Sequence, residues 1–147
     1  MKNLFLSLSI AFFSFGIAQT SVAQTYTVEE VNEAAMKKDG KYALMVDNAS
    51  YLMAAVITGK EYTKQHSDIE YEVILIGNVV KELAEDKELA SFIAESKDFG
   101  IRIVVCEFAM IKLGVEEKDL PSTVDYTANG FTYYFGLQEL GFNTISL

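Results

Sequence analysis

The sequence predicts an α/β domain with a parallel sheet and helices on both faces. Segments that resemble strands and segments that resemble helices alternate along the chain, which is typical of βαβ units. The central strand segments, such as "YALMV" and "IRIVVC", are almost continuously apolar, as in strands buried on both faces. There are no repeats, low-complexity tracts or Pro/Gly/Ser-rich linkers, so we expect one compact domain over about residues 26–147.

The first half of this domain is predicted to be helix, strand, helix and strand. Thr27 and Glu30 form a capping-box pattern for a helix that continues to a stop at Gly40. A strand follows at 41–48, and a helix at 49–65 is expected to be capped by Ser50. The next strand is predicted at 69–78.

The second half repeats the alternation. A helical segment at 79–100, in one or two pieces, ends at Gly100, and a buried strand covers 101–106. A short helix at 107–114 is stopped by Gly114. A short strand around 124–126, an amphipathic helix at 130–141 and a last strand at 142–147 complete the prediction.

The amino terminus resembles a secretory signal peptide. Lys2 gives a short basic region, "LFLSLSIAFFSFGIA" follows as an apolar stretch, and small residues allow cleavage after Ala18 or Ala23. This stretch is short for a membrane span, and no second long apolar segment follows it. We therefore expect residues 1–23 to be removed and the mature protein to be periplasmic or secreted, without a membrane span.

The charge of the chain argues against anionic partners. The formal net charge is −9, and it becomes −10 once Lys2 is removed. A strongly acidic protein without a cluster of Lys and Arg residues repels nucleic acid and anionic membrane surfaces. We therefore expect no nucleic-acid partner.

Three predicted loops should converge at the carboxyl edge of the sheet, where open α/β sheets bind ligands. They carry Asp47 and Asn48, then Gly77 and Asn78, then Cys106 and Glu107. Asp47 and Asn48 could either bind a ligand or cap the helix that follows them. These loop residues are the candidate ligand-binding residues.

Cys106 is the only cysteine, so the domain has no internal disulfide. Its predicted place, between a strand end and a helix start, favours a negatively charged and nucleophilic sulfur. The carboxylate of Glu107 next to it opposes such a charge. The alternative is a buried cysteine that only packs.

The other candidate chemistries lack residues. His66, the only histidine, is expected on the surface at the opposite end of the sheet, away from Cys106. One Cys and one His do not make a usual zinc site, and no EF-hand spacing is present, so we expect no metal. Gly-rich nucleotide loops and GxSxG are also absent, and we expect no cofactor.

Several segments, taken in order, resemble the DsrE/DsrF-like proteins, especially their small exported members. They are "VILIGNVVKEL", "FGIRIVVCEFAMIKLGV", "KDLPSTV" and "GFTYYFGLQELGF", and the resemblance covers about residues 42–147. It implies a three-layer α/β/α sandwich with a mainly parallel five-stranded sheet, and assembly into oligomers. It also implies that Cys106 occupies the position at which sulfur-relay members carry a persulfide.

Three functions remain open at this point. In the first, Cys106 accepts a sulfane sulfur from a donor and passes it to an acceptor, with Asp47, Asn48 and Asn78 shaping the pocket. In the second, the protein is a non-catalytic envelope module that binds a small ligand or a protein, and Cys106 is structural. Redox sensing through one oxidisable thiol ranks last, because the chain has no resolving cysteine.

A homo-oligomer is a separate expectation. Half of the residues are hydrophobic, and the last predicted helix carries an apolar stripe that suits either the core or a subunit contact. The residues of the stripe are Phe131, Tyr134, Phe135, Leu137 and Leu140.

Overall fold

A computed structural model describes residues 26–37 and 39–147. The predicted signal peptide lies outside these residues. The helices are α1 (Val28–Ala35), α2 (Ala49–Gln65), α3 (Val79–Glu85), α4 (Lys87–Ala94), α5 (Glu107–Leu113) and α6 (Gly130–Glu139), with 3₁₀ turns at Glu95–Phe99 and Glu117–Asp119. The strands are β1 (Lys41–Val46), β2 (Glu70–Leu75), β3 (Ile101–Cys106), β4 (Asp125–Thr127) and β5 (Asn143–Ser146).

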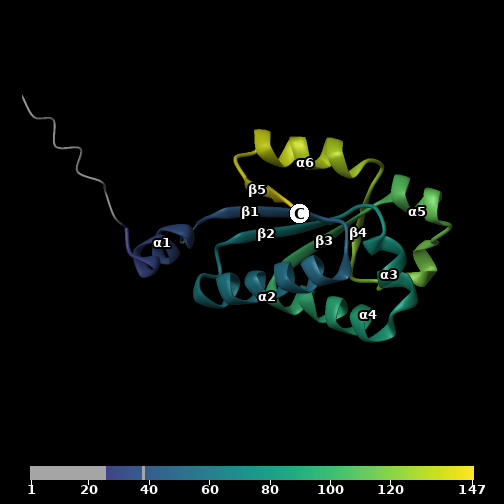
Figure 1. Cartoon of the computed structure of the whole chain (residues 1–147), viewed down its shortest axis with the longest axis horizontal. Coiled ribbons are helices and arrows are strands. Elements are labelled where there is room, and N and C mark those ends of the chain that lie inside the picture. The colour runs from purple at the N-terminus through teal and green to yellow at the C-terminus, as the bar shows by residue number, and fades with distance from the viewer. Residues whose placement is uncertain (1–25, 38) are drawn as a thin grey trace, which may run out of the picture.

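The five strands form one sheet in the order β4-β3-β2-β1-β5, and every neighbouring pair is parallel. Figure 1 shows α6 on one face of this sheet and α2, α3 and α4 on the other. The predicted three-layer α/β/α architecture and five-stranded parallel sheet are therefore confirmed. No helix in the described part of the chain is long and apolar enough to cross a membrane.

The two faces of the sheet carry cores of different size. The larger core packs odd-numbered β2 and β3 residues, such as Val73 and Ile103, against α2 to α5. The smaller one joins Ala43 and Met45 of β1 and Ile74 of β2 to Tyr134 and Leu137 of α6. Since side chains alternate along a strand, the two cores lie on opposite faces of the sheet.

The boundaries of the central elements follow the sequence closely. The helical segment after β2 is divided at Asp86, which caps α4 by accepting from the backbone N–H groups of Glu88 and Leu89. Gly100 ends it in a left-handed conformation with φ of 71°, and Gly114 ends α5 with φ of 69°. Strand β3 covers the predicted 101–106.

Two predicted helix ends are wrong. The capping box of Thr27 and Glu30 is present, but α1 ends at Ala35 rather than at Gly40. Gly40 has another role: a Cβ there would lie 2.4 Å from the ring of Tyr42, so only glycine allows this close approach. Helix α2 is capped by Asn48, not by Ser50, because the Asn48 Oδ1 accepts from the Tyr51 N–H at 3.0 Å.

Candidate functional site

The carboxyl ends of β1, β2 and β3 lie side by side, since these strands are parallel neighbours. Each is followed by a short loop and a helix, so the three predicted loops come to one edge of the sheet. Strand β2 lies between the other two. Gly77 and Asn78 therefore stand between Asp47 on one side and Cys106 on the other.

The polar groups of the β1 loop are bonded within the protein. The Asp47 carbonyl accepts from the Val79 N–H at 2.9 Å, which ties this loop to the start of α3. The Asn48 side chain donates to the Asp47 Oδ1 at 3.0 Å and also caps α2. Of the two roles considered for Asn48, the structure gives it the capping one, and its amide is engaged on both sides.

The β2 loop depends on a glycine and has one exposed side chain. Gly77 adopts φ of 58°, a left-handed conformation that disfavours side chains, and a Cβ there would lie 3.6 Å from the Asp47 Cβ. Asn78 is exposed, and its side chain makes no capping hydrogen bond to α3. Asn78 is thus accessible to a ligand, as is the exposed Asp47.

Glu82 contributes to this edge in a way that the sequence did not reveal. Its Oε2 accepts from the Ala49 N–H at 2.7 Å, so a carboxylate from α3 sits at the amino end of α2. A negative charge is favourable at such a helix start. The contact joins residues 33 positions apart, and no local sequence pattern predicts it.

Cys106 ends β3 and is 5% exposed. Its Sγ accepts from the Gly130 N–H at 3.3 Å. Gly130 is the first residue of α6, so the sulfur lies at the amino end of that helix as well as directly before α5. Unpaired N–H groups and the helix dipole give a helix start partial positive charge, which stabilises a negatively charged sulfur.

The approach of α6 to the sulfur requires a glycine. A Cβ at Gly130 would lie 2.7 Å from the Ile76 Cγ2 and 3.3 Å from the Cys106 Cβ. Asn129 caps the same helix start, because its Oδ1 accepts from the Phe131 N–H at 2.9 Å. The helix start directly after Cys106 is expected from the sequence, whereas this second one is not.

The surroundings of Cys106 combine a half-buried carboxylate with exposed aromatic residues. Glu107 is the first residue of α5 and is partly exposed. Phe108 comes directly after Glu107 on α5, and Phe131 comes directly after Gly130 on α6. Their side chains are 57% and 54% exposed. His66 lies after α2, before the amino end of β2, and so stands at the opposite edge of the sheet from Cys106.

A cavity of about 630 Å³ opens beside this edge, lined by Ala49, Glu82 and residues around the start of α4, but no metal centre is formed there by the residues that the structure describes. Among residues 26–37 and 39–147, no group of three or more His, Cys, Asp or Glu side chains could hold a metal ion. The main cavities formed by the same residues are not lined by Cys106. The groups that this edge offers for chemistry include the hydrogen-bonded Cys106 thiol and the carboxylates of Asp47, Glu82 and Glu107.

A polar network on the α6 face was also missed. The Tyr133 hydroxyl donates to the Glu72 Oε2 at 2.6 Å and accepts from the Arg102 Nη1 at 3.0 Å. Arg102 in turn donates through Nε to the Asp125 Oδ2 at 2.6 Å. Burial, and then the hydrogen bond to Glu72, raise the pKa of Tyr133 to about 12. Glu72 is 8% exposed, and this network supplies the partners that a buried carboxylate needs.

The comparisons with known proteins establish the fold alone. No protein-family model and no curated protein sequence matches the chain. The fold is similar to that of MTH1491, a protein of unknown function from Methanobacterium thermoautotrophicum, with a TM-score of 0.66 and 20% identity over 74% of this chain and 100% of that one. It is also similar to BT1422, a conserved protein of unknown function from Bacteroides thetaiotaomicron, with a TM-score of 0.61 and 19% identity over 76% of this chain and 98% of that one.

Proposed function

We propose that the protein is an exported sulfur carrier of the DsrE/DsrF-like kind, which holds a sulfane sulfur as a persulfide on Cys106. The observation that carries the proposal is the hydrogen bond from the Gly130 N–H to the Cys106 Sγ at the start of α6. A sulfur carrier needs one thiol that can bear negative charge, and this is the environment that supports such a sulfur.

The proposed reaction needs no redox partner. The Cys106 thiolate attacks the terminal sulfur of a persulfide donor, a new S–S bond forms, and the donor's S–S bond breaks. The electron pair of the broken bond leaves with the donor thiolate. In the return step an acceptor thiolate attacks the outer sulfur, and Cys106 leaves as a thiolate. The Gly130 N–H stabilises the Cys106 thiolate before the first step and after the second.

Donor and acceptor have to reach a sulfur that is 5% exposed. Gly130 lies against the sulfur, and the two residues before it, Ala128 and Asn129, are exposed. Phe108 and Phe131, the second residues of α5 and α6, have exposed rings that suit a protein partner, because aromatic residues are enriched at interfaces. A donor or acceptor protein that docks on these rings would displace residues 128–130.

Location and assembly form part of the same proposal. The basic and apolar pattern of residues 1–23 supports export to the periplasm or the medium. Phe131, Phe135 and Leu140 of the predicted apolar stripe are more than half exposed, whereas Tyr134 and Leu137 are buried in the smaller core. The exposed half of α6 therefore supports a homo-oligomer.

The test is the intact mass of mature protein before and after treatment with a small-molecule persulfide donor. The expected result is a gain of one sulfur atom that a reductant removes and that Cys106→Ser abolishes. Ser122→Cys on the exposed loop before β4 provides the matched control in the Cys106→Ser background, because it offers a thiol without a helix start. Equal sulfur loading of both thiols under limiting donor would contradict a specialised role for Cys106.

The second candidate is a non-catalytic envelope module in which Cys106 is structural. The low exposure of Cys106 favours it, together with the absence of this residue from the lining of the main cavities in residues 26–37 and 39–147. Under this alternative, native protein would gain no sulfur from the donor, while the same protein in denaturant would react. That outcome would replace the carrier proposal with this one.

A further inference from the structure

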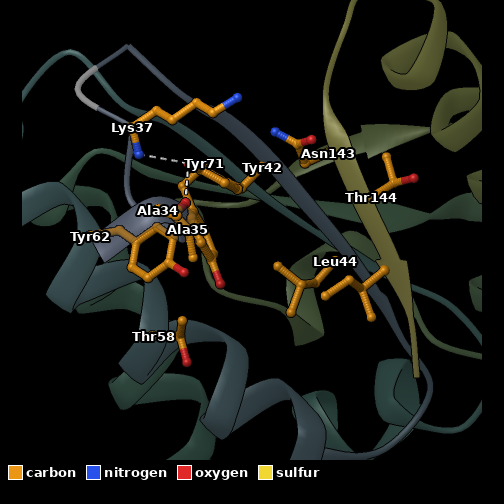
Figure 2. Close-up of a pocket in the computed structure, with 11 residues that line it drawn as sticks. Ala34, Ala35, Lys37, Tyr42, Leu44, Thr58, Tyr62, Tyr71, Asn143 and Thr144 are labelled. Atoms are coloured by element: carbon orange, nitrogen blue, oxygen red, sulfur yellow. Dashed lines mark hydrogen bonds between the residues drawn. The ribbon is translucent and has the colours of Figure 1, made fainter. Parts of the chain in front are cut away.

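A cavity of about 420 Å³ lies at the other side of the molecule, between α1, α2 and the adjacent strands β1 and β5 (Figure 2). Its lining includes Ala34 of α1, Leu44 of β1 and Ile145 of β5, together with Tyr42, Tyr62 and Tyr71. The volume falls in the range of small-molecule sites, and such sites are mostly apolar with a few placed polar groups. This cavity does not include Cys106.

The three tyrosines form a connected aromatic cluster. The ring of Tyr62 stands edge-on to that of Tyr42 at 5.0 Å between centroids and edge-on to that of Tyr71 at 6.0 Å. These rings come from α2, β1 and β2, so the cluster fixes one wall of the cavity on rigid elements. Edge-to-face contacts of this kind hold aromatic side chains in place.

The hydroxyl groups of the cluster differ in how they are bonded. The Tyr42 hydroxyl donates to the Ala35 carbonyl and accepts from the Lys37 N–H, which joins the end of α1 to β1. The Tyr71 side chain is the most deeply buried of the cavity lining, at 2% exposed. Its hydroxyl has no hydrogen-bond partner among the residues that the structure describes.

An unpartnered hydroxyl on the lining of an apolar cavity points to a ligand atom. Buried polar side-chain atoms are hydrogen-bonded in the large majority of cases, and exceptions call for an explanation. Burial, and then the neighbouring Tyr62, raise the pKa of Tyr71 above its ordinary value. The phenol therefore keeps its proton at physiological pH and acts as a hydrogen-bond donor.

We propose that this cavity binds a small, mostly apolar molecule with an acceptor oxygen, such as a ketone or an ether, that receives a hydrogen bond from Tyr71. The apolar body of the ligand packs against Leu44, Ile145 and the Tyr62 ring. The Tyr71 hydroxyl has less than 1 Å² of accessible surface, so the ligand oxygen meets it once a neighbouring lining side chain moves aside. This binding site is separate from the proposed sulfur chemistry, because Tyr42 and Tyr71 lie near the amino ends of β1 and β2, whereas Cys106 lies at the carboxyl end of β3.

The experiment compares two probes of similar shape, acetophenone and ethylbenzene, by NMR titration of the mature protein. We expect acetophenone to shift resonances of Ala34, Leu44 and Ile145 and to leave those of Gly130 unchanged. One hydrogen bond corresponds to a preference of about fivefold to tenfold for the ketone over the hydrocarbon. Tyr71→Phe should remove this preference, so that both probes bind with similar affinity.

Two further variants keep the result unambiguous. Tyr51→Phe, on the exposed side of α2 and outside the cavity, is the matched control and should keep the full preference. Ile145→Phe adds volume to the lining at a residue that is 56% exposed, so the fold tolerates it, and it should weaken both probes. If neither probe shifts the lining residues at millimolar concentration, or if Tyr71→Phe keeps the preference for the ketone, the proposal is overturned.

Discussion

The two ends of the sheet differ in how their polar groups are bonded. At the carboxyl ends of β1 and β3, Asn48 is bonded on both sides and the Cys106 sulfur accepts from Gly130. Near the amino ends of β1, β2 and β5, three tyrosines border a cavity, and the Tyr71 hydroxyl finds no partner among residues 26–37 and 39–147.

The difference follows from how the chain reaches each end. Each carboxyl-edge loop leads directly from a buried strand into a helix that packs on the sheet, so neighbouring loops satisfy one another, as Asp47 and Val79 do. At the other side, α1 has no buried residue and is tied to the domain by the Tyr42 hydroxyl, which leaves space between α1, α2 and β5. The carboxyl edge, with its hydrogen-bonded loops, therefore suits the proposed chemistry of Cys106. The cavity between α1, α2 and β5 suits the proposed binding of a small ligand.

The largest effect is expected from the glycine that brings α6 to the sulfur. In Gly130→Ala the new Cβ meets the Ile76 side chain at 2.7 Å and the Cys106 Cβ at 3.3 Å, so the helix start must move. Overpacking of this kind costs about 1–3 kcal/mol in the free energy of unfolding. Urea denaturation measures this loss, and the reaction rate of Cys106 with iodoacetamide should rise because its cover is displaced.

Gly59→Ala is the matched change near the other end of the sheet. Its Cβ would lie 2.8 Å from the Tyr71 ring, but alanine also gains about 1 kcal/mol of helix propensity, which offsets part of the strain. We expect a smaller loss of stability and an unchanged rate of Cys106 alkylation. A rise in that rate equal to the one in Gly130→Ala would mean that the two ends are not independent.

The network under α6 predicts a pH dependence. The pKa of Tyr133 is raised to about 12, so the folded protein holds this phenol proton more tightly than the unfolded chain does. Its stabilisation is complete below the ordinary tyrosine pKa of about 10 and is lost as the pH rises towards 12. Tyr133→Phe should cost about 1–3 kcal/mol at pH 7, because it removes a hydrogen bond to the charged Glu72.

Thermal unfolding followed by circular dichroism between pH 8 and about 12 measures this dependence. The stability of Tyr133→Phe should fall less steeply above pH 10 than that of the wild type. Tyr51→Phe, which removes an exposed hydroxyl, is the control and should follow the wild type. Parallel curves for wild type and Tyr133→Phe would show that another group controls alkaline unfolding.

A smaller effect separates the predicted cap of α2 from the observed one. Asn48→Ala removes the acceptor for the Tyr51 N–H and should cost about 1 kcal/mol in the free energy of unfolding. Ser50→Ala, at the residue expected from sequence, should change it by less than about 0.5 kcal/mol, since Ser50 lies inside the helix and is exposed. Urea denaturation of both variants decides between the two caps.

The smallest change is expected from Tyr71→Phe. The Tyr71 hydroxyl is buried and has no partner in the described part of the chain, so its removal relieves a desolvation cost, and stability should stay the same or rise by about 1 kcal/mol. A loss of more than about 1 kcal/mol in urea denaturation would show that the hydroxyl has a partner in the folded protein, and would weaken the argument for a ligand there.

The sequence was sufficient for the features that depend on local pattern. Strand β3, its end at Cys106 and the helix stops at Gly100 and Gly114 follow from apolar runs and glycines, and the structure has them where predicted. Alternating strands and helices were enough to predict a parallel sheet covered on both faces, because few other arrangements bury such strands.

What could not be predicted depends on contacts between distant segments. The hydrogen bond between the Gly130 N–H and the Cys106 sulfur joins residues 24 positions apart. The hydrogen bond between Tyr133 and Glu72 joins residues 61 positions apart. The cavity joins α1, which lies outside the segment of family resemblance, to strands from both ends of the chain. Neither hydrophobic periodicity nor residue spacing predicts these long-range contacts, since they form only when α6 crosses the sheet and α1 folds against it.

The central claim, that Cys106 is a working thiol of the folded protein, is tested most directly by the rate at which native protein reacts with iodoacetamide at neutral pH. If the claim holds, one equivalent reacts, the rate is proportional to reagent concentration, and a stabilising osmolyte that suppresses global unfolding does not slow it. If alkylation instead requires global unfolding, so that its rate falls in step with the unfolded population as osmolyte is added, Cys106 is a core residue and the carrier proposal is wrong.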